Sequence, residues 1–211
     1  MSELLVHTFI ILFVVVDPIG NAPIFAALTR GADEAERRAM AAKGVLLAAP
    51  ILLAFFFTGN ALLSALGIGI PAFRIAGGVL LFLLAIDMVF ARHSGLRGTT
   101  VSEEQEAHGR TDISIFPLAF PLIAGPGAIT TVLLMASDWG GWEVMGLRVG
   151  MIALVLGLTW VSLAFTARLL RLLGETGANV VDRVLGLLLA ALAVQFIVDG
   201  VRPILHPAAS T

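Results

Sequence analysis

The sequence predicts an all-α integral membrane protein whose six transmembrane helices form two inverted three-helix repeats. Three observations favour this fold class: an apolar composition, six apolar segments of membrane-spanning length, and a similarity between the two halves of the chain. Hydrophobic residues make up 58% of the 211 residues, charged residues only 13%, and the mean hydropathy is +0.98. A soluble domain of this size cannot bury so much apolar surface. We therefore expect the lipid bilayer to surround the chain.

The composition also excludes several classes of protein. A net charge of -2, without any run of basic residues, argues against nucleic acid as a partner. The absence of cysteine removes disulfides, thiolate metal sites and thiol redox chemistry. The four histidines fall in loops or near the ends of apolar segments, at His7, His93, His108 and His206. We therefore predict a protein that is not an enzyme and that holds no metal and no cofactor.

Six segments are long and apolar enough to cross the membrane, since a helix needs roughly 20 apolar residues to span about 30 Å of hydrocarbon. They are Leu4 to Leu28, Gly44 to Leu66, Pro71 to Ala91, Ile113 to Ala136, Met145 to Leu170 and Val184 to Val201. The first segment lacks a basic region before it and a clear cleavage site after it, so we interpret it as a span and not as a signal peptide.

Two polar segments interrupt this pattern. Residues 92–112 have no apolar period and form the predicted cytoplasmic linker between a first repeat, residues 1–91, and a second repeat, residues 113–211. In the other polar segment, Asp33 stands three residues before Glu36, which is typical of a helix start. The second helix is therefore expected to begin outside the membrane.

The basic residues predict the orientation of the chain. Ten of the 13 Lys and Arg residues follow the first, third and fifth spans: Arg30, Arg37, Arg38, Lys43, Arg92, Arg97, Arg110, Arg168, Arg171 and Arg183. The opposite side keeps Arg74, Arg148 and Arg202. By the positive-inside rule, the larger set is cytoplasmic and both termini are periplasmic or extracellular. A multi-pass protein of the bacterial inner (plasma) membrane is expected.

The two halves of the chain resemble each other. The third span opens with Arg74 followed by a glycine three residues later, and the sixth opens in the same way from Arg183. Pro18 in the first span and Pro126 in the fourth occupy corresponding places. Because each half has an odd number of spans, the second copy must be inverted relative to the first. Secondary transporters use inverted repeats of this kind.

The first and fourth spans each contain a predicted break near the bilayer midplane, at "DPIGNA" and at "GPGAIT". Lipid cannot satisfy the backbone groups that such breaks free, so protein or a water-filled cavity must surround them. Asp17 has the chemistry of an N-cap with Pro18 in the first helical position, and Gly125 stands in the same relation to Pro126. Two helix N-termini, which favour anions, are then expected to face one cavity.

These breaks supply the candidate binding residues: Asp17, Pro18, Gly20, Asn21, Gly125, Pro126, Gly127, Ala128, Thr130 and Thr131. The helix N-termini suit a carboxylate, while Asp17 and Asn21 offer oxygen atoms to an ammonium group or a cation. A small zwitterion would therefore have a complementary group for each of its two charges. Prolines and glycines alone often mark simple kinks, but an ionisable residue at mid-span costs at least about 2.5 to 3.5 kcal/mol to insert. The combination therefore favours a functional site.

Coupling or gating residues are predicted at Asp17, Asp87 and Gln195, the polar residues inside the first, third and sixth spans. Gain and loss of a proton on Asp17 would link transport to the proton gradient. Sodium held by the same carboxylate and by exposed carbonyl oxygens is the alternative. Asn60 is expected to bond a neighbouring helix instead.

The segments "DPIGNAPIF", "FPLIAGPGAITTVL" and "LAALAVQFIVDGV" together resemble the MarC family of six-span bacterial inner-membrane proteins, within the LysE-type exporter superfamily. The resemblance covers essentially the whole chain. It implies transport of small neutral amino acids such as glycine and alanine. It also implies substrate contact at the positions of the two motifs, Asp17 to Asn21 and Gly125 to Gly127. It does not fix the substrate, the direction of transport or the coupling ion.

Other functions stay open from the sequence. The chain would otherwise export another small metabolite, a drug or an ion, or serve as a non-transporting membrane assembly protein. A channel needs a continuous polar stripe, whereas the polar residues here converge on one depth. A membrane enzyme needs a nucleophile with a base, or metal ligands, and neither is visible. Faces of small residues permit a homodimer without requiring one.

Overall fold

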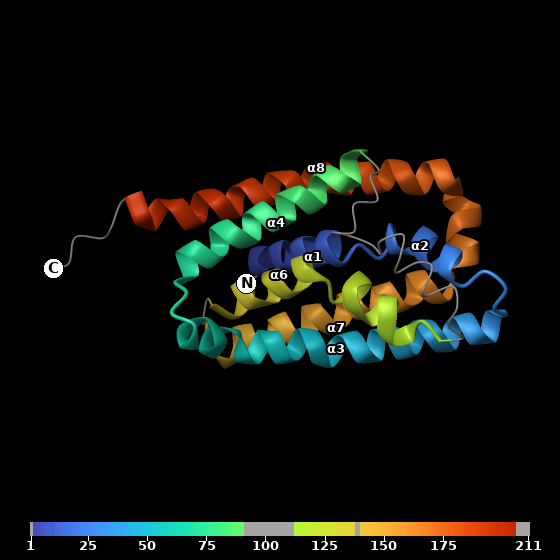
Figure 1. Cartoon of the computed structure of the whole chain (residues 1–211), viewed down its shortest axis with the longest axis horizontal. Coiled ribbons are helices and arrows are strands. Elements are labelled where there is room, and N and C mark those ends of the chain that lie inside the picture. Colours follow the sequence, from blue (N-terminus) through green and yellow to red (C-terminus); the bar gives the residue numbers. More distant parts are fainter. Residues whose placement is uncertain (1, 91–111, 138–139, 206–211) are drawn as a thin grey trace.

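The computed structural model describes residues 2–90, 112–137 and 140–205, and all regular structure in these ranges is helical (Figure 1). The elements are α1 (Ser2–Val16), α2 (Asn21–Leu28), α3 (Glu34–Ala65), α4 (Ile70–Phe90), η1 (Ser114–Ile123), α6 (Pro126–Ser137), α7 (Trp142–Ala164) and α8 (Thr166–Leu205). The predicted linker, residues 92–112, lies outside the described residues except for Asp112.

The helices form an elongated bundle with two long helix pairs at its edges. Helices α3 and α7 lie side by side along one edge, α4 and α8 along the opposite edge, and α1 and α6 between them (Figure 1). In the first span, 61% of the most apolar 18-residue window is buried, whereas the corresponding windows of α3, α4, α7 and α8 are only 22–33% buried. The broken first span therefore lies in the centre of the bundle, where protein and not lipid surrounds it.

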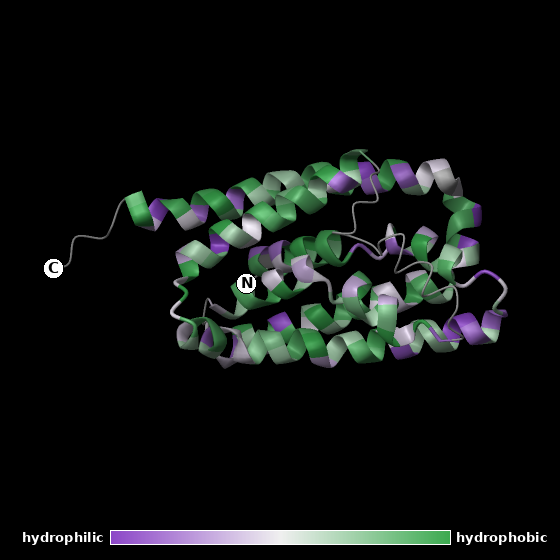
Figure 2. Ribbon diagram, in the orientation of Figure 1, coloured by the Kyte–Doolittle hydropathy of each residue, from purple (hydrophilic) through white to green (hydrophobic). Residues whose placement is uncertain are grey.

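The predicted membrane class is confirmed. Five described helical segments are long and apolar enough to cross a membrane, and η1 with α6, bent by 56°, forms a sixth when the pair is counted as one span. Hydrophobic residues make up most of the helix length, and hydrophilic residues gather at the end where α3 begins (Figure 2).

Two predicted span boundaries are wrong. Helix α7 ends at Ala164 and not at Leu170, and the candidate span within α8 begins at Thr176, before the predicted Val184. The chain turns at Gly174, where φ is +68°, a conformation that glycine adopts at little cost. The helix then continues through polar residues before its apolar part, so hydropathy alone gave too late a start.

The predicted start of the second helix is confirmed. Asp33 caps α3 by accepting a hydrogen bond from the Glu36 N–H at 2.8 Å, and the Glu36 carboxylate accepts one from the Asp33 N–H at 2.9 Å. This reciprocal capping box satisfies two N–H groups that a helix start leaves open. With 32 residues, α3 extends well beyond the predicted apolar span.

Glycines allow α4 and α8 to pack closely in antiparallel directions. A methyl group on Gly78 would meet the Ala193 carbonyl oxygen and the Ile197 side chain at 2.7 Å. A methyl group on Gly186 would meet Met88 at 2.7 Å and the backbone nitrogen of Val89 at 3.1 Å. Larger residues would push these backbones apart, as in other membrane helix pairs that pack on small residues.

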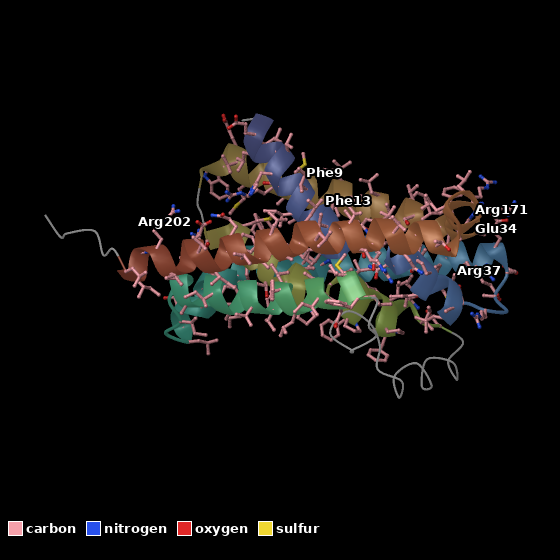
Figure 3. The ribbon with its side chains drawn as sticks, turned by 90° about the horizontal axis from the view of Figure 1, so that it is seen from above. Phe9, Phe13, Glu34, Arg37, Arg171 and Arg202 are labelled. Atoms are coloured by element: carbon pink, nitrogen blue, oxygen red, sulfur yellow. The ribbon has the colours of Figure 1, made fainter. Side chains whose placement is uncertain are left out.

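Charged residues mark both ends of the bundle. Glu34, Arg37 and Arg171 gather at the end where α3 begins, and Arg202 lies near the opposite end (Figure 3). At the first end, Arg38 and Arg168 both stack over the Phe165 ring, with guanidinium carbons 5.1 and 5.3 Å from its centroid. Which end is cytoplasmic stays a prediction of the positive-inside rule.

Candidate functional site

The first span is interrupted between α1 and α2. Asp17 has a φ of +48°, a left-handed conformation that aspartate tolerates better than most residues. Residues 18–20 form a turn, and α2 begins at Asn21. The predicted helix start at Pro18 is therefore wrong, because the left-handed Asp17 directs the chain into a turn before the helix resumes.

Protein groups satisfy the polar groups at this break. The Asp17 Oδ1 atom accepts a hydrogen bond from the Gly20 N–H at 3.0 Å, so its side chain caps the turn. The Ser162 hydroxyl of α7 donates to the Pro18 carbonyl oxygen at 2.5 Å. A break inside an apolar bundle is tolerated when neighbouring helices supply such partners. Asp17 itself is only 2% exposed.

The fourth span is interrupted between η1 and α6. Pro126 is the first residue of α6, as predicted, and the Gly125 carbonyl oxygen accepts the Ile129 N–H at 3.0 Å. A methyl group on Gly125 would collide with the Pro121 carbonyl oxygen, so this turn has room only for glycine. The prolines of η1, Pro117 and Pro121, interrupt its regular helical hydrogen bonding.

The two breaks face one small cavity, here called the Asp17 cavity. Its polar and small-residue wall consists of Asp17, Asn21, Gly125, Pro126, Gly127 and Ala128. The Asn21 amide donates to the Val16 carbonyl oxygen at 2.8 Å and to the Leu122 carbonyl oxygen at 3.4 Å, so it joins both breaks. The cavity volume is about 20 Å³, enough for a single water molecule.

Apolar side chains close the cavity around Gly127. A methyl group at this position would lie 3.1–3.2 Å from Leu81, Leu84 and Val15. These contacts are tighter than ordinary van der Waals separations, so a side chain on residue 127 would have to displace its neighbours. Gly127 therefore lets these apolar side chains pack against the start of α6, where they close the cavity.

The remaining predicted residues lie elsewhere. Pro18 and Gly20 form the turn beside the cavity. The Thr130 methyl group packs against Gly77 of α4, and Thr131 lines a different cavity. Asp87 is 6% exposed on α4 and does not line the Asp17 cavity.

Gln195 is exposed on α8, outside the Asp17 cavity, and donates to the Asp199 carboxylate at 2.9 Å. The expected interhelical bond of Asn60 is confirmed, since its amide donates to the Ala136 carbonyl oxygen at 3.1 Å.

A second and larger cavity was not expected from the sequence. This arginine cavity has a volume of about 190 Å³, and its polar wall consists of His7, Thr8, Arg74, Thr131, Arg148 and Asp199. Arg148 is only 7% exposed, and its guanidinium donates to the Met135 carbonyl oxygen at 2.6 Å. The available signal was the position of Arg74 and Arg148, since each stands a turn or more inside its helix and not in a loop.

Comparison with known proteins gives a consistent family. The model of the MarC family of integral membrane proteins matches residues 2–205. The membrane protein YvbG of Bacillus subtilis is 39% identical over 203 residues, which cover 96% of each chain. The inner membrane protein YhgN of Escherichia coli is 36% identical over 203 residues, covering 96% of this chain and 98% of its own.

The relatives also extend to archaea. A membrane protein of Archaeoglobus fulgidus is 37% identical over 194 residues, covering 92% of this chain and 90% of its own. No solved structure matches the chain. The family match over nearly the whole length, the full-length relatives and the membrane-spanning helices agree with the resemblance of the two motifs. The chain therefore belongs to the MarC family of integral membrane proteins.

Proposed function

We propose that this protein is a secondary active transporter that moves small neutral amino acids, glycine and alanine first among them, across the bacterial inner membrane by alternating access. One observation carries the proposal. A buried carboxylate and amide, Asp17 and Asn21, share a single cavity with the start of α6. An intramembrane ionisable residue beside a broken helix is the usual composition of a transport site.

The chemistry of the cavity suits a zwitterion. The N–H groups of Gly127 and Ala128 belong to the first turn of α6, where backbone donors have no partner within the helix. Together with the helix dipole they favour a carboxylate. The side-chain oxygens of Asp17 and Asn21 offer hydrogen-bond acceptors to an ammonium group, and a carboxyl group keeps acceptor capacity when it is protonated. Both ends of a small amino acid therefore have a complementary group in one cavity.

The size of the cavity favours a small substrate. At about 20 Å³ it holds no more than a water molecule, and Leu81, Leu84 and Val15 crowd Gly127. Loading a substrate therefore requires the broken helices to separate, and each added substrate carbon demands a larger separation. This requirement supports glycine and alanine over larger amino acids.

The packing of the helices supports two related halves. Under exchange of the halves, the contact of α1 with α7 corresponds to that of η1 with α3, and the contact of α4 with α6 corresponds to that of α8 with α2. All four contacts are present. The pairs α3 with α7 and α4 with α8 correspond to themselves. This is the pattern expected of an inverted repeat whose halves rock around a central site.

A shared offset of 108 positions supports the same relation and corrects by one position the predicted match of Arg74 with Arg183, which are 109 positions apart. Pro18 and Pro126 are 108 positions apart, and so are Gly78 and Gly186. In the α4–α8 pair, Gly78 approaches Ile197, and Gly186 approaches Val89, which is again 108 positions from Ile197.

The charges at the two ends of the bundle favour one orientation. The larger basic set lies at the end of the bundle that includes Arg37 and Arg171, so we place that end in the cytoplasm (Figure 3). The start of α1 and the end of α8 are then on the periplasmic or extracellular side.

Proton coupling is favoured over sodium coupling. The substrate carboxylate and the Asp17 carboxylate would occupy the same small cavity, where like charges repel strongly. Binding of the substrate is therefore more favourable when Asp17 carries a proton. Movement of the substrate and of one proton would then be linked without any further ion site.

The test is uptake of labelled glycine and alanine into proteoliposomes under an imposed proton or sodium gradient. We expect the native protein to accumulate both substrates with the proton gradient. Asp17→Asn should lose accumulation but retain exchange of substrate across the membrane, because asparagine mimics a permanently protonated carboxyl group. Glu3→Gln, which removes an exposed carboxylate from the same helix, is the matched control and should accumulate substrate normally.

Two results would contradict the proposal. Accumulation by Asp17→Asn at the native level would remove Asp17 from the coupling mechanism. No uptake of either amino acid in any gradient, with correctly inserted protein, would exclude small amino acids and favour export of another small metabolite.

A further inference from the structure

The turn between α1 and α2, which places Asp17 in its cavity, contains a carbonyl group that the local backbone does not satisfy. In a regular helix start the Pro18 carbonyl oxygen would accept the Ala22 N–H, four residues on. Pro23 has no N–H to give to the Ile19 carbonyl oxygen, and the Ala22 N–H donates there instead, at 3.2 Å. The Pro18 carbonyl oxygen is therefore left without a donor from its own turn.

Ser162 of α7 supplies the missing donor. Its hydroxyl donates to the Pro18 carbonyl oxygen at 2.5 Å, the one hydrogen bond that this oxygen accepts within the described ranges. Serine and threonine inside a helix often bond a carbonyl oxygen one turn earlier in the same helix, as Thr159 does by donating to Val155 at 2.8 Å. Ser162 instead joins two elements that are 144 positions apart in the sequence.

The second break has neither of these features. At the offset of 108 positions, Pro23 corresponds to Thr131, which has an N–H group. Ser162 corresponds to Ala54, which has no hydroxyl. Pro126 is the first residue of α6, so its carbonyl oxygen belongs to the regular hydrogen bonding of that helix. The hydroxyl is thus found in the half whose broken span lacks a backbone donor, and not at the corresponding position of the other half.

Hydrogen bonds from Ser162 and from Asn21 tie this break to other helices. The Asn21 amide reaches the Leu122 carbonyl oxygen of η1 at 3.4 Å, which is longer than usual for a hydrogen bond. Ser162 therefore provides the shorter of these two anchors. An anchor is needed here because Asp17, with a φ of +48°, has a backbone conformation that persists only where the surrounding structure holds it.

We infer that Ser162 is a positioning residue for the Asp17 cavity. Its hydrogen bond to Pro18 holds the turn against α7 and thereby keeps Asp17 and Asn21 facing the start of α6. Ser162 is not among the described residues that line the cavity, so its effect passes through the residue that follows Asp17. The consequence for solute binding rests on the proposed transport function, whereas the anchoring of the turn does not.

Hydrogen exchange of the purified full-length protein in detergent tests the anchoring, with mass spectrometry of a segment that contains residues 17–22. We expect Ser162→Ala to raise the exchange rate of this segment about two- to tenfold, the effect of one lost hydrogen bond. Ser162→Thr retains a hydroxyl and should exchange like the native protein. Thr159→Val is the matched control, because it removes a buried hydroxyl of α7 that bonds its own helix, and it should leave this segment unchanged.

Transport of labelled glycine into proteoliposomes tests the consequence for the solute. We expect Ser162→Ala to raise KM about two- to tenfold and to change kcat less, because the groups that bind the solute are held less firmly. Ser162→Thr should restore the native KM, and Thr159→Val should retain it. A merely structural role would lower the amount of folded protein and leave the KM of the folded fraction unchanged.

The outcomes separate this inference from the proposed function. Faster exchange and a raised KM in Ser162→Ala support both. Faster exchange in Ser162→Ala, when the native protein transports no amino acid, supports the anchor and removes the proposed function. Native exchange in Ser162→Ala overturns the inference, even if transport depends on Asp17. A native KM in Ser162→Ala, or an equal rise of KM in Thr159→Val, overturns it as well.

Discussion

The two cavities of this protein lie one turn apart along α1 and α6 but are built in opposite ways. The Asp17 cavity is formed by interrupted backbone and small residues, holds about one water molecule, and carries a carboxylate. The arginine cavity is formed by side chains of α1, α4, α6, α7 and α8, is about 190 Å³ in volume, and carries two guanidinium groups. The first cavity is bounded mainly by turns and small residues, and the second mainly by larger polar and apolar side chains.

The difference suggests different tasks. A cavity made of turns and glycines changes its volume when short helices move, so it suits a site that opens and closes. A cavity lined by helical residues, with one arginine bonded to the backbone, is expected to change its shape less. Under the proposed function, the first cavity is therefore suited to the transport step.

The largest effect should come from filling the Asp17 cavity. Gly127→Leu introduces a side chain where even a methyl group would crowd Leu81, Leu84 and Val15, so we expect loss of transport and a loss of stability of about 1 to 3 kcal/mol. Gly150→Leu is the matched control, because Gly150 of α7 is exposed with open space around it. That control should be neutral or more stable, as leucine favours helix. Native transport by Gly127→Leu would show that the cavity is not used.

A smaller effect is expected from removing the fixed arginine. Arg148→Gln deletes the charged donor of the 2.6 Å hydrogen bond to the Met135 carbonyl oxygen, which is typically worth about 1.5 to 3 kcal/mol. Chemical unfolding in detergent measures this loss. Arg202→Gln, at an exposed position of α8, should change the free energy of unfolding by less than about 0.5 kcal/mol. Equal losses in the two variants would mean that the arginine cavity is not rigidly built.

The smallest effect lies outside both cavities, where Lys43 forms an ion pair with Asp112. The hydrogen bond from Lys43 lowers the pKa of Asp112 from 3.8 to about 2. The unfolded chain therefore takes up a proton at higher pH than the folded one, so the stabilisation is complete above about pH 4 and is lost as the pH falls toward 2. Both side chains are about half exposed, which limits the contribution to less than about 1 kcal/mol.

Thermal unfolding of the native protein and of Lys43→Gln between pH 2 and pH 7 tests this pair. The difference in melting temperature should be constant near neutral pH and should shrink below about pH 4. A difference that grows on acidification would contradict the assigned pair.

Most of the fold could be predicted from the sequence because bilayer thickness imposes a length on apolar segments. The six spans, the capping box at Asp33 and the break before Pro126 all follow from local chemistry. The end of α7 and the start of the spanning part of α8 did not, because α7 stops at Ala164 although apolar residues follow it, and α8 begins in polar residues before its apolar run. The start of α2 at Asn21 was missed because a left-handed Asp17 adds a turn that spacing alone does not reveal.

The candidate site was predicted less evenly. Asp17, Asn21 and the turn at Gly125 were expected together because both breaks were expected at the same depth, and they do line one cavity. Thr131 was assigned to the same group, since it stands close in sequence, yet the helix turns it toward Arg148. Residues from five helices line the arginine cavity. The sequence pattern of a single helix does not reveal which other helices it will contact.

The pair of helices α4 and α8 has the same close contact twice, once where Gly78 approaches α8 and once where Gly186 approaches α4. These two contacts are equivalent, so as a pair they resist tilting equally in either direction and make neither end of the bundle easier to open. Any preference for one open state must then arise from parts that are not equivalent. The two unequal cavities, one lined by Ala128 and the other by Thr131, are such parts. Their occupancy would decide which end of the bundle is open at rest.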